Sequence, residues 1–375
     1  MTAPVHPAGP GELADWDAHT VRPPGGHVLQ SLAWATHRAA TGQRAHFLVT
    51  ADGGRVLVLE RPWPLLPGGR GYVSRGPAPV VAPEAAAARL VAVTGWLGSH
   101  GFDVVVADPE IPAASSYVEA IRAAGFGPVE EIQAARHTMR LALGPGVDDA
   151  AAWSGVTRST RQRVRQAETS VSVVHHDGRA AGDEPAAPAG LAAPSEPAET
   201  ALDRFYDMLT ETGERVGFTL ASRASAVGWW VTAYRAGWLI YLEARVDDEP
   251  AGGLALYRHG GRLATFVSGD RTAVRRAHPG IMHLLRWRAI QLAIAEGCPE
   301  IDLGGVDVAG ARGRPGPGDP TFGLYEHKRS FGAEWVELAG AHRRVLSPAR
   351  HELGRVLSRG GRVLSRAAGA LGGAR

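Results

Sequence analysis

The chain has 375 residues, of which 45% are hydrophobic and 21% charged, and its formal net charge is +2. That length exceeds what one hydrophobic core usually supports, so the composition favours a globular protein of two lobes and excludes a repeat array or a filament. The N-terminus lacks a basic flank and an apolar stretch, the lone Cys298 cannot form an internal disulfide, and no Cys or His spacing matches a zinc site; we therefore expect a cytosolic protein without a structural metal.

The first half of the sequence predicts a hairpin, a third strand, a helix and a fourth strand. Residues 46–60, HFLVTADGGRVLVLE, place two strand-like runs around an Asp-Gly-Gly turn, and GYVSRGPAPV at 71–80 is typical of a strand. An Ala-rich helix is expected from about Glu84 to Ser99, followed by the apolar strand VVVADP.

The second half repeats this order. Residues 238–246 and 251–261 form a predicted hairpin, 262–270 a strand, 281–296 a helix and 300–305 a strand. Acyltransferases of the GNAT type use this order around a mixed sheet. We predict an α/β fold of the α+β kind, with two GNAT-like lobes, each a mixed β-sheet flanked by helices, and a cleft between them; a generic pair of α/β domains is the alternative.

The lobe boundaries follow from composition. We assign residues 1–150 to the first lobe, which segment 335–346 completes, and residues 151–334 to the second lobe, with a flexible Ala/Pro-rich loop at about 177–199. Residues 347–375 form a basic tail with six Arg against one Glu. This tail predicts either a segment that lies on anionic lipid at the inner face of the plasma membrane or a frayed terminus.

An arginine-rich segment joins the lobes. Arg158, Arg161 and Arg165 fall on one helical face, Arg163 lies nearby, and no acidic residue follows before Glu168. Such a stripe suits the phosphate of a nucleotide diphosphate, a lipid diphosphate or tRNA, or is simply a solvated face.

The chain has 40 Lys and Arg residues, and only Lys328 is a lysine. A lysine ammonium is compact and has a tunable pKa, whereas the arginine guanidinium is a fixed planar fork, so a site that needs the former does not accept the latter. Lys328 is therefore a candidate functional residue, with chance retention as the alternative.

Coenzyme A is not an expected donor. GNAT enzymes bind its pyrophosphate with a glycine-rich turn that opens the central helix. The corresponding segments here, RRAHPGIMH in the second half and APEAAAAR in the first, lack the glycine spacing. The acyl donor is predicted to be another compound.

Seven segments resemble one family in order and approximate spacing. They are HVLQSLAWATHR, YVSRGPAPV, VVVADPE, VTRSTRQRVRQAE, ETGERVGF, IDLGGVD and GLYEHKRSFGAEWVELAG. Between Leu29 and Gly340 the chain resembles the Fem aminoacyltransferases, the FemX-like enzymes that build interpeptide bridges in peptidoglycan. The resemblance implies two GNAT-like lobes, aminoacyl-tRNA as co-substrate, and transfer to the stem-peptide amine of a peptidoglycan precursor (lipid II or a UDP-linked muropeptide), with no cofactor and no metal.

The resemblance also implies roles for the last motif. The family's Gly-Leu-Tyr-x-Phe-Lys segment corresponds to GLYEHK, so stabilisation of the transition state transfers to Lys328, and Tyr325 and His327 are assigned to substrate binding. His327 stands where the family has Phe. Its ring either stacks on the tRNA end or titrates near neutral pH and moves protons.

The first lobe supplies further candidates by the same resemblance. Gln30 and Trp34 match a substrate-lobe motif, although this Trp would equally suit the core. Arg75 is expected either to bind phosphate or to hold the end of a strand. Asp108 resembles the acidic residue that meets the incoming amine, so it is a catalytic candidate, with a turn-capping Asp as the alternative.

The second lobe supplies three more substrate-binding candidates. Arg158 belongs to the arginine stripe, Arg215 resembles the arginine that contacts the precursor's diphosphate, and Phe266 stands where aromatic residues line the peptide channel.

The sequence leaves two other functions open. One is a tRNA-dependent or acyl-CoA-dependent N-acyltransferase that acts on a small peptide or another amine in a tailoring pathway. The other is a non-catalytic module that binds tRNA or a lipid diphosphate. Nothing in the motifs identifies the donor amino acid.

Overall fold

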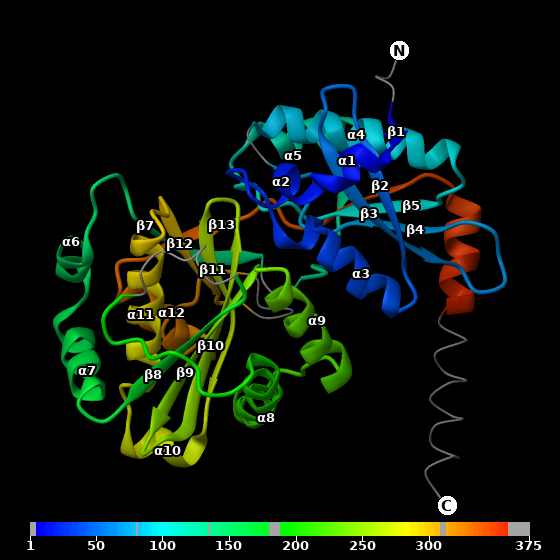
Figure 1. Ribbon diagram of the computed structural model, residues 1–375. Helices are drawn as coiled ribbons and strands as arrows, with labels where there is room; N and C mark the ends of the chain where they lie inside the picture. The colour runs from blue at the N-terminus through cyan, green and yellow to red at the C-terminus, as the bar shows by residue number, and fades with distance from the viewer. Residues whose placement is uncertain (1–4, 80–81, 134–135, 180–187, 308–312, 359–375) are drawn as a thin grey trace, which may run out of the picture. The chain divides into compact units, whose positions relative to one another are not determined.

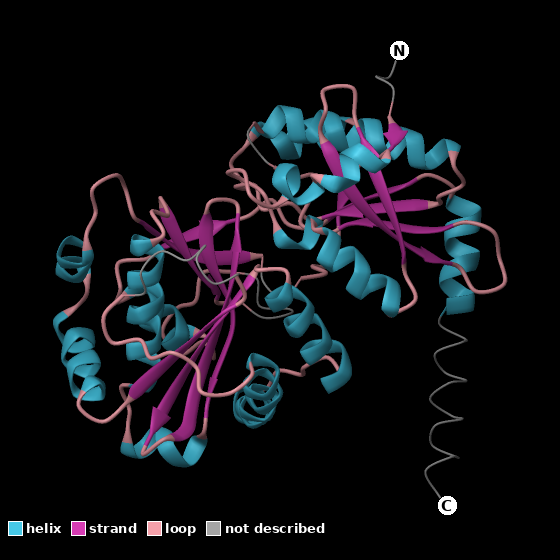
Figure 2. Cartoon of the chain, viewed as in Figure 1, coloured by secondary structure: helices cyan, strands magenta, loops and turns pink. Residues whose placement is uncertain are grey.

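The computed structural model describes residues 5–79, 82–133, 136–179, 188–307 and 313–358 (Figure 1). The chain divides into two compact units. Unit 1 comprises residues Met1–Gln133 and Leu338–Arg375, and unit 2 comprises Ala134–Glu337. Each unit is built on one sheet with helices against it (Figure 2).

Unit 1 contains a seven-stranded mixed sheet. Its strand order is β1-β2-β3-β4-β5-β14-β6, in which only the β4–β5 pair is parallel among the described strands. The strands are β1 (His6–Pro7), β2 (Arg44–Val49), β3 (Arg55–Pro62), β4 (Gly69–Val73), β5 (Val104–Ala107), β6 (Gly127–Pro128) and β14 (His342–Val345). The helices are α1 (Pro10–Ala14), α2 (Trp16–Thr20), α3 (Leu32–Ala40), α4 (Pro83–Ser99) and α5 (Ser116–Ala123), with a 3₁₀ turn η1 at Val28–Gln30.

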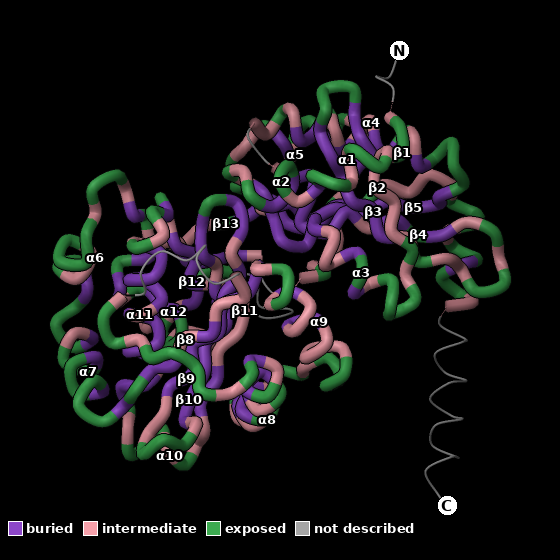
Figure 3. The backbone as a smooth tube through the Cα atoms, viewed as in Figure 1, coloured by how far each residue is buried: buried purple, intermediate pink, exposed green. Residues whose placement is uncertain are grey.

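Strand β3 shows why both faces of this sheet are covered. Val56 and Val58 pack into the cluster built by α4 and α5, whereas Leu57 and Leu59 pack with Trp16 on the other face. Successive side chains of a strand point to opposite faces, so an unbroken apolar run predicts burial on both sides. Figure 3 shows the strands of both units as largely buried.

Unit 2 contains a second seven-stranded mixed sheet. Its order is β13-β7-β12-β11-β10-β9-β8, and its parallel pair is β11–β12. The strands are β7 (His137–Ala142), β8 (Ser172–Asp177), β9 (Leu239–Val246), β10 (Glu249–His259), β11 (Arg262–Asp270), β12 (Glu300–Gly305) and β13 (Glu334–Glu337). The helices are α6 (Asp149–Gly155), α7 (Arg158–Glu168), α8 (Ala198–Val216), α9 (Arg223–Arg235), α10 (Thr272–Ala277), α11 (Ile281–Ala295) and α12 (Phe322–Arg329).

The repeated order of elements predicted from the sequence is confirmed. In unit 1 the hairpin β2–β3 leads through β4 and α4 to β5, and in unit 2 the hairpin β9–β10 leads through β11 and α11 to β12. The turn between β9 and β10 places Asp247 and Asp248 at φ values of 50° and 64°, the left-handed region that two-residue hairpin turns require. The predicted strand at 71–80 ends early, at Val73.

Long-range pairing places the unit boundary differently from the sequence-based division at residue 150. Strand β7 hydrogen-bonds to β12 and β13, so residues 137–142 lie in the sheet of unit 2. Of the segment 335–346, β13 also joins unit 2, and only β14 completes the sheet of unit 1, beside β5.

Two segments expected to be irregular are partly ordered. In the Ala/Pro-rich segment 177–199, Ala192 pairs with Val174 of β8, and Glu196 binds Arg204 and Arg245; residues 180–187 lie outside the described residues. In the tail, residues 348–358 are helical, and Arg350 binds Asp103 at 2.6 Å. The remaining tail residues, 359–375, lie outside the described part. No helix within the described ranges is long and apolar enough to cross a membrane.

Candidate functional site

Lys328 lies on the inner face of α12. The ammonium Nζ donates hydrogen bonds to the backbone carbonyls of Gly304, at 2.8 Å, and Gly305, at 2.6 Å, at the end of β12. Tyr325, one turn earlier, is buried on the same face. Within the described residues Lys328 forms no ion pair with a carboxylate. Two backbone carbonyls contact its ammonium, and Asp302 and Asp307 favour its charge only from beyond ion-pair distance.

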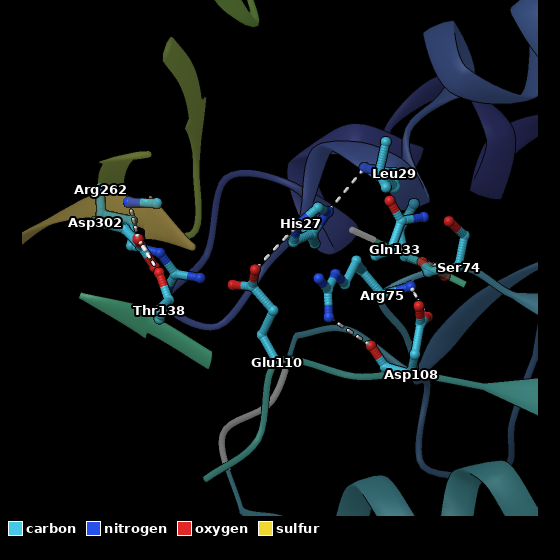
Figure 4. A network of polar contacts seen from close by, with 12 residues as sticks. His27, Leu29, Ser74, Arg75, Asp108, Glu110, Gln133, Thr138, Arg262 and Asp302 are labelled. Atoms are coloured by element: carbon cyan, nitrogen blue, oxygen red, sulfur yellow. Dashed lines mark hydrogen bonds and ion pairs between the residues drawn. The ribbon is translucent and has the colours of Figure 1, made fainter. Parts of the chain in front are cut away.

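The two carbonyls are held in place by the backbone of β12. Gly304 has φ +84°, and an added Cβ would lie 2.6 Å from the carbonyl oxygen of Thr265, so only glycine fits there. Asp302 accepts a hydrogen bond from the backbone N–H of Gly304 at 2.7 Å. It accepts another from the hydroxyl of Thr138 (Figure 4). We call the carbonyls of Gly304 and Gly305 the carbonyl cradle.

A second cation is buried near Lys328. Arg286 of α11 is 1% exposed and donates from Nη1 to the carbonyl of Leu303 at 3.1 Å. Burial lowers the pKa of Arg286 to about 10. Burial, and then the positive charge of Arg286, hold the pKa of Lys328 well below its ordinary value. The environment therefore disfavours the ammonium, and an anion placed beside it would be strongly favoured.

His327 belongs to a chain of hydrogen bonds with guanidinium groups at both ends. Arg286 Nε donates a hydrogen bond to His327 Nε2 at 3.2 Å. The other ring nitrogen, His327 Nδ1, lies 3.2 Å from His283 Nε2. Arg163 Nη1 lies 3.4 Å from the same His283 nitrogen. Because a guanidinium only donates, the geometry fixes His327 as the neutral tautomer that carries its proton on Nδ1.

The electrostatics of the histidines agree with this assignment. Burial and the neighbouring Arg286 hold the pKa of His327 well below its ordinary value, and burial with Arg163 lowers the pKa of His283 to about 4. Of the two roles expected for His327, titration near neutral pH is therefore disfavoured. The stacking role stays a prediction; within unit 2 the His327 ring meets the rings of His283 and Phe331 edge-on.

Tyr325 and Phe266 occupy different surroundings. Tyr325 is 4% exposed in the core of unit 2, and its hydroxyl accepts hydrogen bonds from Arg314 at 2.6 and 2.8 Å. Phe266 of β11 is partly exposed and stacks on Tyr257 with ring centroids 4.0 Å apart. Only Phe266 of this pair offers ring surface to solvent.

The two arginine candidates of unit 2 differ in their partners. Arg215, near the end of α8, binds Asp270 at 2.6 Å and the hydroxyl of Thr272 at 2.7 Å. Its charge is thus already balanced within the unit. Arg158, at the start of α7, is exposed and has no carboxylate partner among the residues that the structure describes.

Asp108 lies directly after β5, fully buried in unit 1. Its carboxylate accepts a hydrogen bond from the Tyr72 hydroxyl at 2.8 Å. It accepts a second, also at 2.8 Å, from the backbone N–H of Arg75 (Figure 4). Burial raises the pKa of Asp108 to about 6, against the opposing effect of Arg75. A carboxylate poised near neutral pH is suited to proton transfer, and these contacts also show it holding two strand ends together.

Arg75 is held around the same carboxylate. It adopts a left-handed conformation with φ 49°, and its guanidinium donates to the carbonyl of Asp108 at 3.3 Å. His27 and Glu110 lie beside this carboxylate, with Nε2 and Oε1 3.5 Å apart (Figure 4). The strand-end role expected for Arg75 is therefore visible, and phosphate binding stays a prediction.

Gln30 is a clamp within unit 1. It is fully buried, and its amide exchanges hydrogen bonds with both backbone groups of Leu57 and donates to the carbonyl of Ser74 at 2.8 Å. Trp34 is half-buried; it stacks on His37, and the Arg38 guanidinium lies 5.0 Å from its ring centre. Gln30 therefore positions the segment that carries Arg75.

The structure thus brings six of the candidates together in two sets. Gln30, Arg75 and Asp108 adjoin one another in unit 1, where Gln30 binds the carbonyl of Ser74, and Lys328, His327 and Tyr325 share α12 in unit 2. The other four lie on separate elements: Trp34 on α3, Arg158 on α7, Arg215 on α8 and Phe266 on β11. Whether the two sets act on one substrate stays a prediction.

The sequence reading missed Arg286, His283, Asp302 and Tyr72. Arg286 carried a detectable signal: apolar residues occur on every side of α11 instead of along one stripe, and a helix of that kind is buried. A charge in the middle of such a helix is a candidate for a functional role. The other three residues carried no signal beyond their place in the motifs.

The fold is similar to known structures. A family model described as "Acetyltransferase (GNAT) domain" matches residues 154–329. The crystal structure of FemX is 18% identical to this chain, with a TM-score of 0.71 over 93% of this chain and 99% of that one. A conserved protein of unknown function from Bacteroides thetaiotaomicron is 12% identical, with a TM-score of 0.53 over 91% and 98%. A search of curated proteins found no match. The protein has a FemX-like duplicated GNAT fold.

Proposed function

We propose that the protein is an aminoacyltransferase that takes an aminoacyl group from aminoacyl-tRNA and joins it to the stem-peptide amine of a peptidoglycan precursor. The observation that carries this proposal is the state of Lys328, a buried lysine that two backbone carbonyls hold and that forms no ion pair with a carboxylate among the described residues. The resemblance of the sequence motifs to the Fem aminoacyltransferases supplies the substrates.

The chemistry of the reaction explains why such a cation is useful. The amine nitrogen attacks the ester carbonyl carbon, negative charge develops on the carbonyl oxygen, and the carbon–oxygen bond to the ribose then breaks. A lysine ammonium has three N–H donors, and the carbonyl cradle uses two of them. The third N–H of Lys328 is proposed to stabilise the developing oxyanion.

The start of α11 supports a donor other than coenzyme A. In a GNAT enzyme this helix N-terminus receives the pyrophosphate. Here an added Cβ on Gly280, at the N-terminus of α11, would lie 2.4 Å from the carbonyl oxygen of Arg163, so α7 packs directly against this position. At the start of α4 in unit 1, Glu84 places a carboxylate where an anion would have to bind.

The proton released by the amine must reach the departing ribose oxygen. Asp108 is the proposed carrier, because its pKa of about 6 lets the carboxylate accept a proton near neutral pH and release it again. Its hydrogen bonds to Tyr72 and Arg75 fix its orientation. Direct transfer from the amine to the ribose oxygen is the alternative, in which Asp108 is only structural.

The proposed setting is the cytoplasm, where charged tRNA is available, with peripheral contact between the basic tail and the inner face of the plasma membrane. No cofactor or metal takes part in the proposed reaction. The match to an acetyltransferase model favours a second candidate, an acyl-CoA-dependent N-acyltransferase that acts on another amine.

The test uses the full chain, charged tRNAs, and either lipid II or a UDP-linked muropeptide as acceptor. The expected product is heavier than the acceptor by one aminoacyl residue, detected by mass spectrometry. Lys328→Ala should lower transfer by about 100- to 1000-fold, and Lys328→Arg should fail as well, because a guanidinium does not fit the carbonyl cradle. Arg329→Ala, at an exposed neighbour, is the matched control.

Two results would contradict the proposal. Full transfer by either Lys328 variant would remove the assigned role of the lysine. Absence of product with every charged tRNA would refute tRNA dependence, and an acetyl-CoA assay on the same acceptors would then decide between the second candidate and simple binding.

A further inference from the structure

Helix α7 has one apolar face and one arginine face. Its buried residues are Thr160, Val164 and Ala167, which recur at helical spacing and pack toward α11. The opposite face is exposed (Figure 3). Arg158 and Arg165 lie on that face two turns apart, and Arg163 lies beside it.

The arginines of α7 lack carboxylate partners within the described residues. Five other arginines on the helices of unit 2 are paired, namely Arg204–Glu196, Arg215–Asp270, Arg223–Asp203, Arg235–Glu199 and Arg288–Glu168. The last pair matters most, because Glu168 is the acidic residue of α7 itself and Arg288 of α11 neutralises it. The positive face of α7 is therefore left without a counter-charge.

Hydrogen bonds tie the start of α7 to the helix that carries Lys328. The backbone N–H of Thr157 donates to the carbonyl of Ser330 at 2.9 Å, and the hydroxyl of Thr160 donates to that of Ser330 at 2.8 Å. Ser330 in turn donates to the carbonyl of His327. A polyanion whose reactive end lay at Lys328 would thus find the arginine face on the adjoining helix.

We propose that the exposed face of α7 binds the sugar-phosphate backbone of the RNA that carries the acyl group. The inference rests on the proposed function and extends it from the reactive end of the donor to its polyanionic body. Eleven residues make α7 about 16 Å long, a length over which one stacked nucleic-acid strand carries roughly five phosphates. Arg158 and Arg165 are separated by about 10 Å along the helix, so they contact different phosphates.

An anionic membrane is the competing partner, and the composition of the face disfavours it. A helix that lies on a bilayer inserts an apolar face between the lipids. In α7 the apolar residues Val164 and Ala167 are buried in the core of unit 2 and are not available to insert into a bilayer. The exposed residues are Arg, Gln and Ser, which suit hydrogen bonds to phosphate and sugar oxygens, together with Glu168, which is paired with Arg288.

The test measures equilibrium binding of a deacylated tRNA pool to the full-length protein across a salt series. The variant Arg158→Gln/Arg165→Gln should bind at least tenfold more weakly at low salt, and its plot of log affinity against log salt should be shallower by about 1.4 to 1.8. Arg223→Gln/Arg235→Gln removes the same charge from paired sites and should bind like the wild type. Arg158→Lys/Arg165→Lys should retain the salt slope, because lysine also binds phosphate as a point charge.

Binding to deacylated tRNA needs no transfer, so the two proposals fail separately. Wild-type transfer without any effect of the α7 variants on tRNA binding would overturn the α7 proposal and leave the proposed function intact. Equal losses in the α7 variant and the paired-arginine control would also overturn it, because net charge alone would then explain the binding. So would loss of binding to phosphatidylglycerol vesicles with unchanged binding to tRNA. Loss confined to the α7 variant and to RNA would support it, even if no transfer were found.

Discussion

Replacing Lys328 by Met tests the central feature of the site, because Met fills a similar volume without a charge. In the folded protein, burial and Arg286 hold the pKa of Lys328 well below its value of 10.5 in an unfolded chain. Below the folded-state pKa, both states carry the proton and the folded state bears the full cost of the buried charge. As pH rises toward 10.5, the folded state releases the proton first, so the free energy of unfolding increases.

The size of this effect follows from linkage. Each pH unit that lies between the folded-state pKa and 10.5 contributes up to about 1.4 kcal/mol, so the wild type should gain stability over the variant as the pH rises through that interval. The variant also leaves the carbonyl cradle without its donor, which costs about 1–3 kcal/mol. That cost hardly changes with pH, so the pH dependence of the stability difference is the informative quantity.

The assay is urea unfolding, monitored peptide by peptide through hydrogen exchange and mass spectrometry. Peptides from α11 and β12 report on unit 2, and peptides from α4 and β5 report on unit 1, which serves as an internal reference. Arg329→Met removes an exposed cation one residue away and should leave both pH profiles unchanged.

Parallel pH profiles for the wild type and Lys328→Met would refute the reasoning, because they would mean that the buried amine keeps its ordinary pKa. Transfer should also fall about 100- to 1000-fold in the Met variant. A variant that loses the pH effect and still transfers at full rate would separate the buried charge from catalysis.

Three further predictions concern groups that the structure places in internal networks. His327→Phe should lower the free energy of unfolding of unit 2 by about 1–3 kcal/mol, because Arg286 Nε loses its buried acceptor. The acid limb of the pH–rate profile should stay in place. Loss of that limb would show that the histidine moves protons. In the wild type, the infrared band of the protonated Asp108 carboxyl should disappear as the pH rises through about 6. Asp108→Asn should lack this band at every pH. A band that persists in the variant would belong to another group. Gln30→Ala should destabilise unit 1 by about 3 kcal/mol, since three backbone groups lose a hydrogen-bond partner. The KM for the precursor should not rise. A raised KM at unchanged stability would support a substrate-binding role for Gln30.

The internal order of each unit could be predicted because its signals are local. The Asp-Gly-Gly turn before Arg55 and the Asp-Asp turn after Val246 mark hairpins, and the strands beside them are rich in β-branched residues. The pairing of β7 with β12 and β13 could not be predicted, because no local pattern states which strand a distant segment will join. The boundary at residue 150 fell on the wrong side of β7 for that reason.

The site was predictable by residue type but not by environment. Lys328 stood out because arginine replaces lysine everywhere else in the chain. The carbonyl cradle was not predictable, since it is built from the backbone of Gly304 and Gly305 and appears only once β12 and α12 pack together. Gln30 and Arg215 carried family roles, yet each has strong partners within its own unit.

The structure also gives a physical reason for a lone lysine. Arginine serves at the many positions where a carboxylate partner accepts its planar fork, as for Arg204 and Arg258. At position 328 the partners are two adjacent carbonyl oxygens, 2.6 and 2.8 Å from the lysine nitrogen, and Lys328 is 4% exposed. A compact ammonium donates to both oxygens from one nitrogen and keeps a third N–H. The donors of a guanidinium are spread over a plane, so they do not match two carbonyl oxygens that converge on one point. The geometry of the carbonyl cradle therefore favours lysine over arginine at position 328.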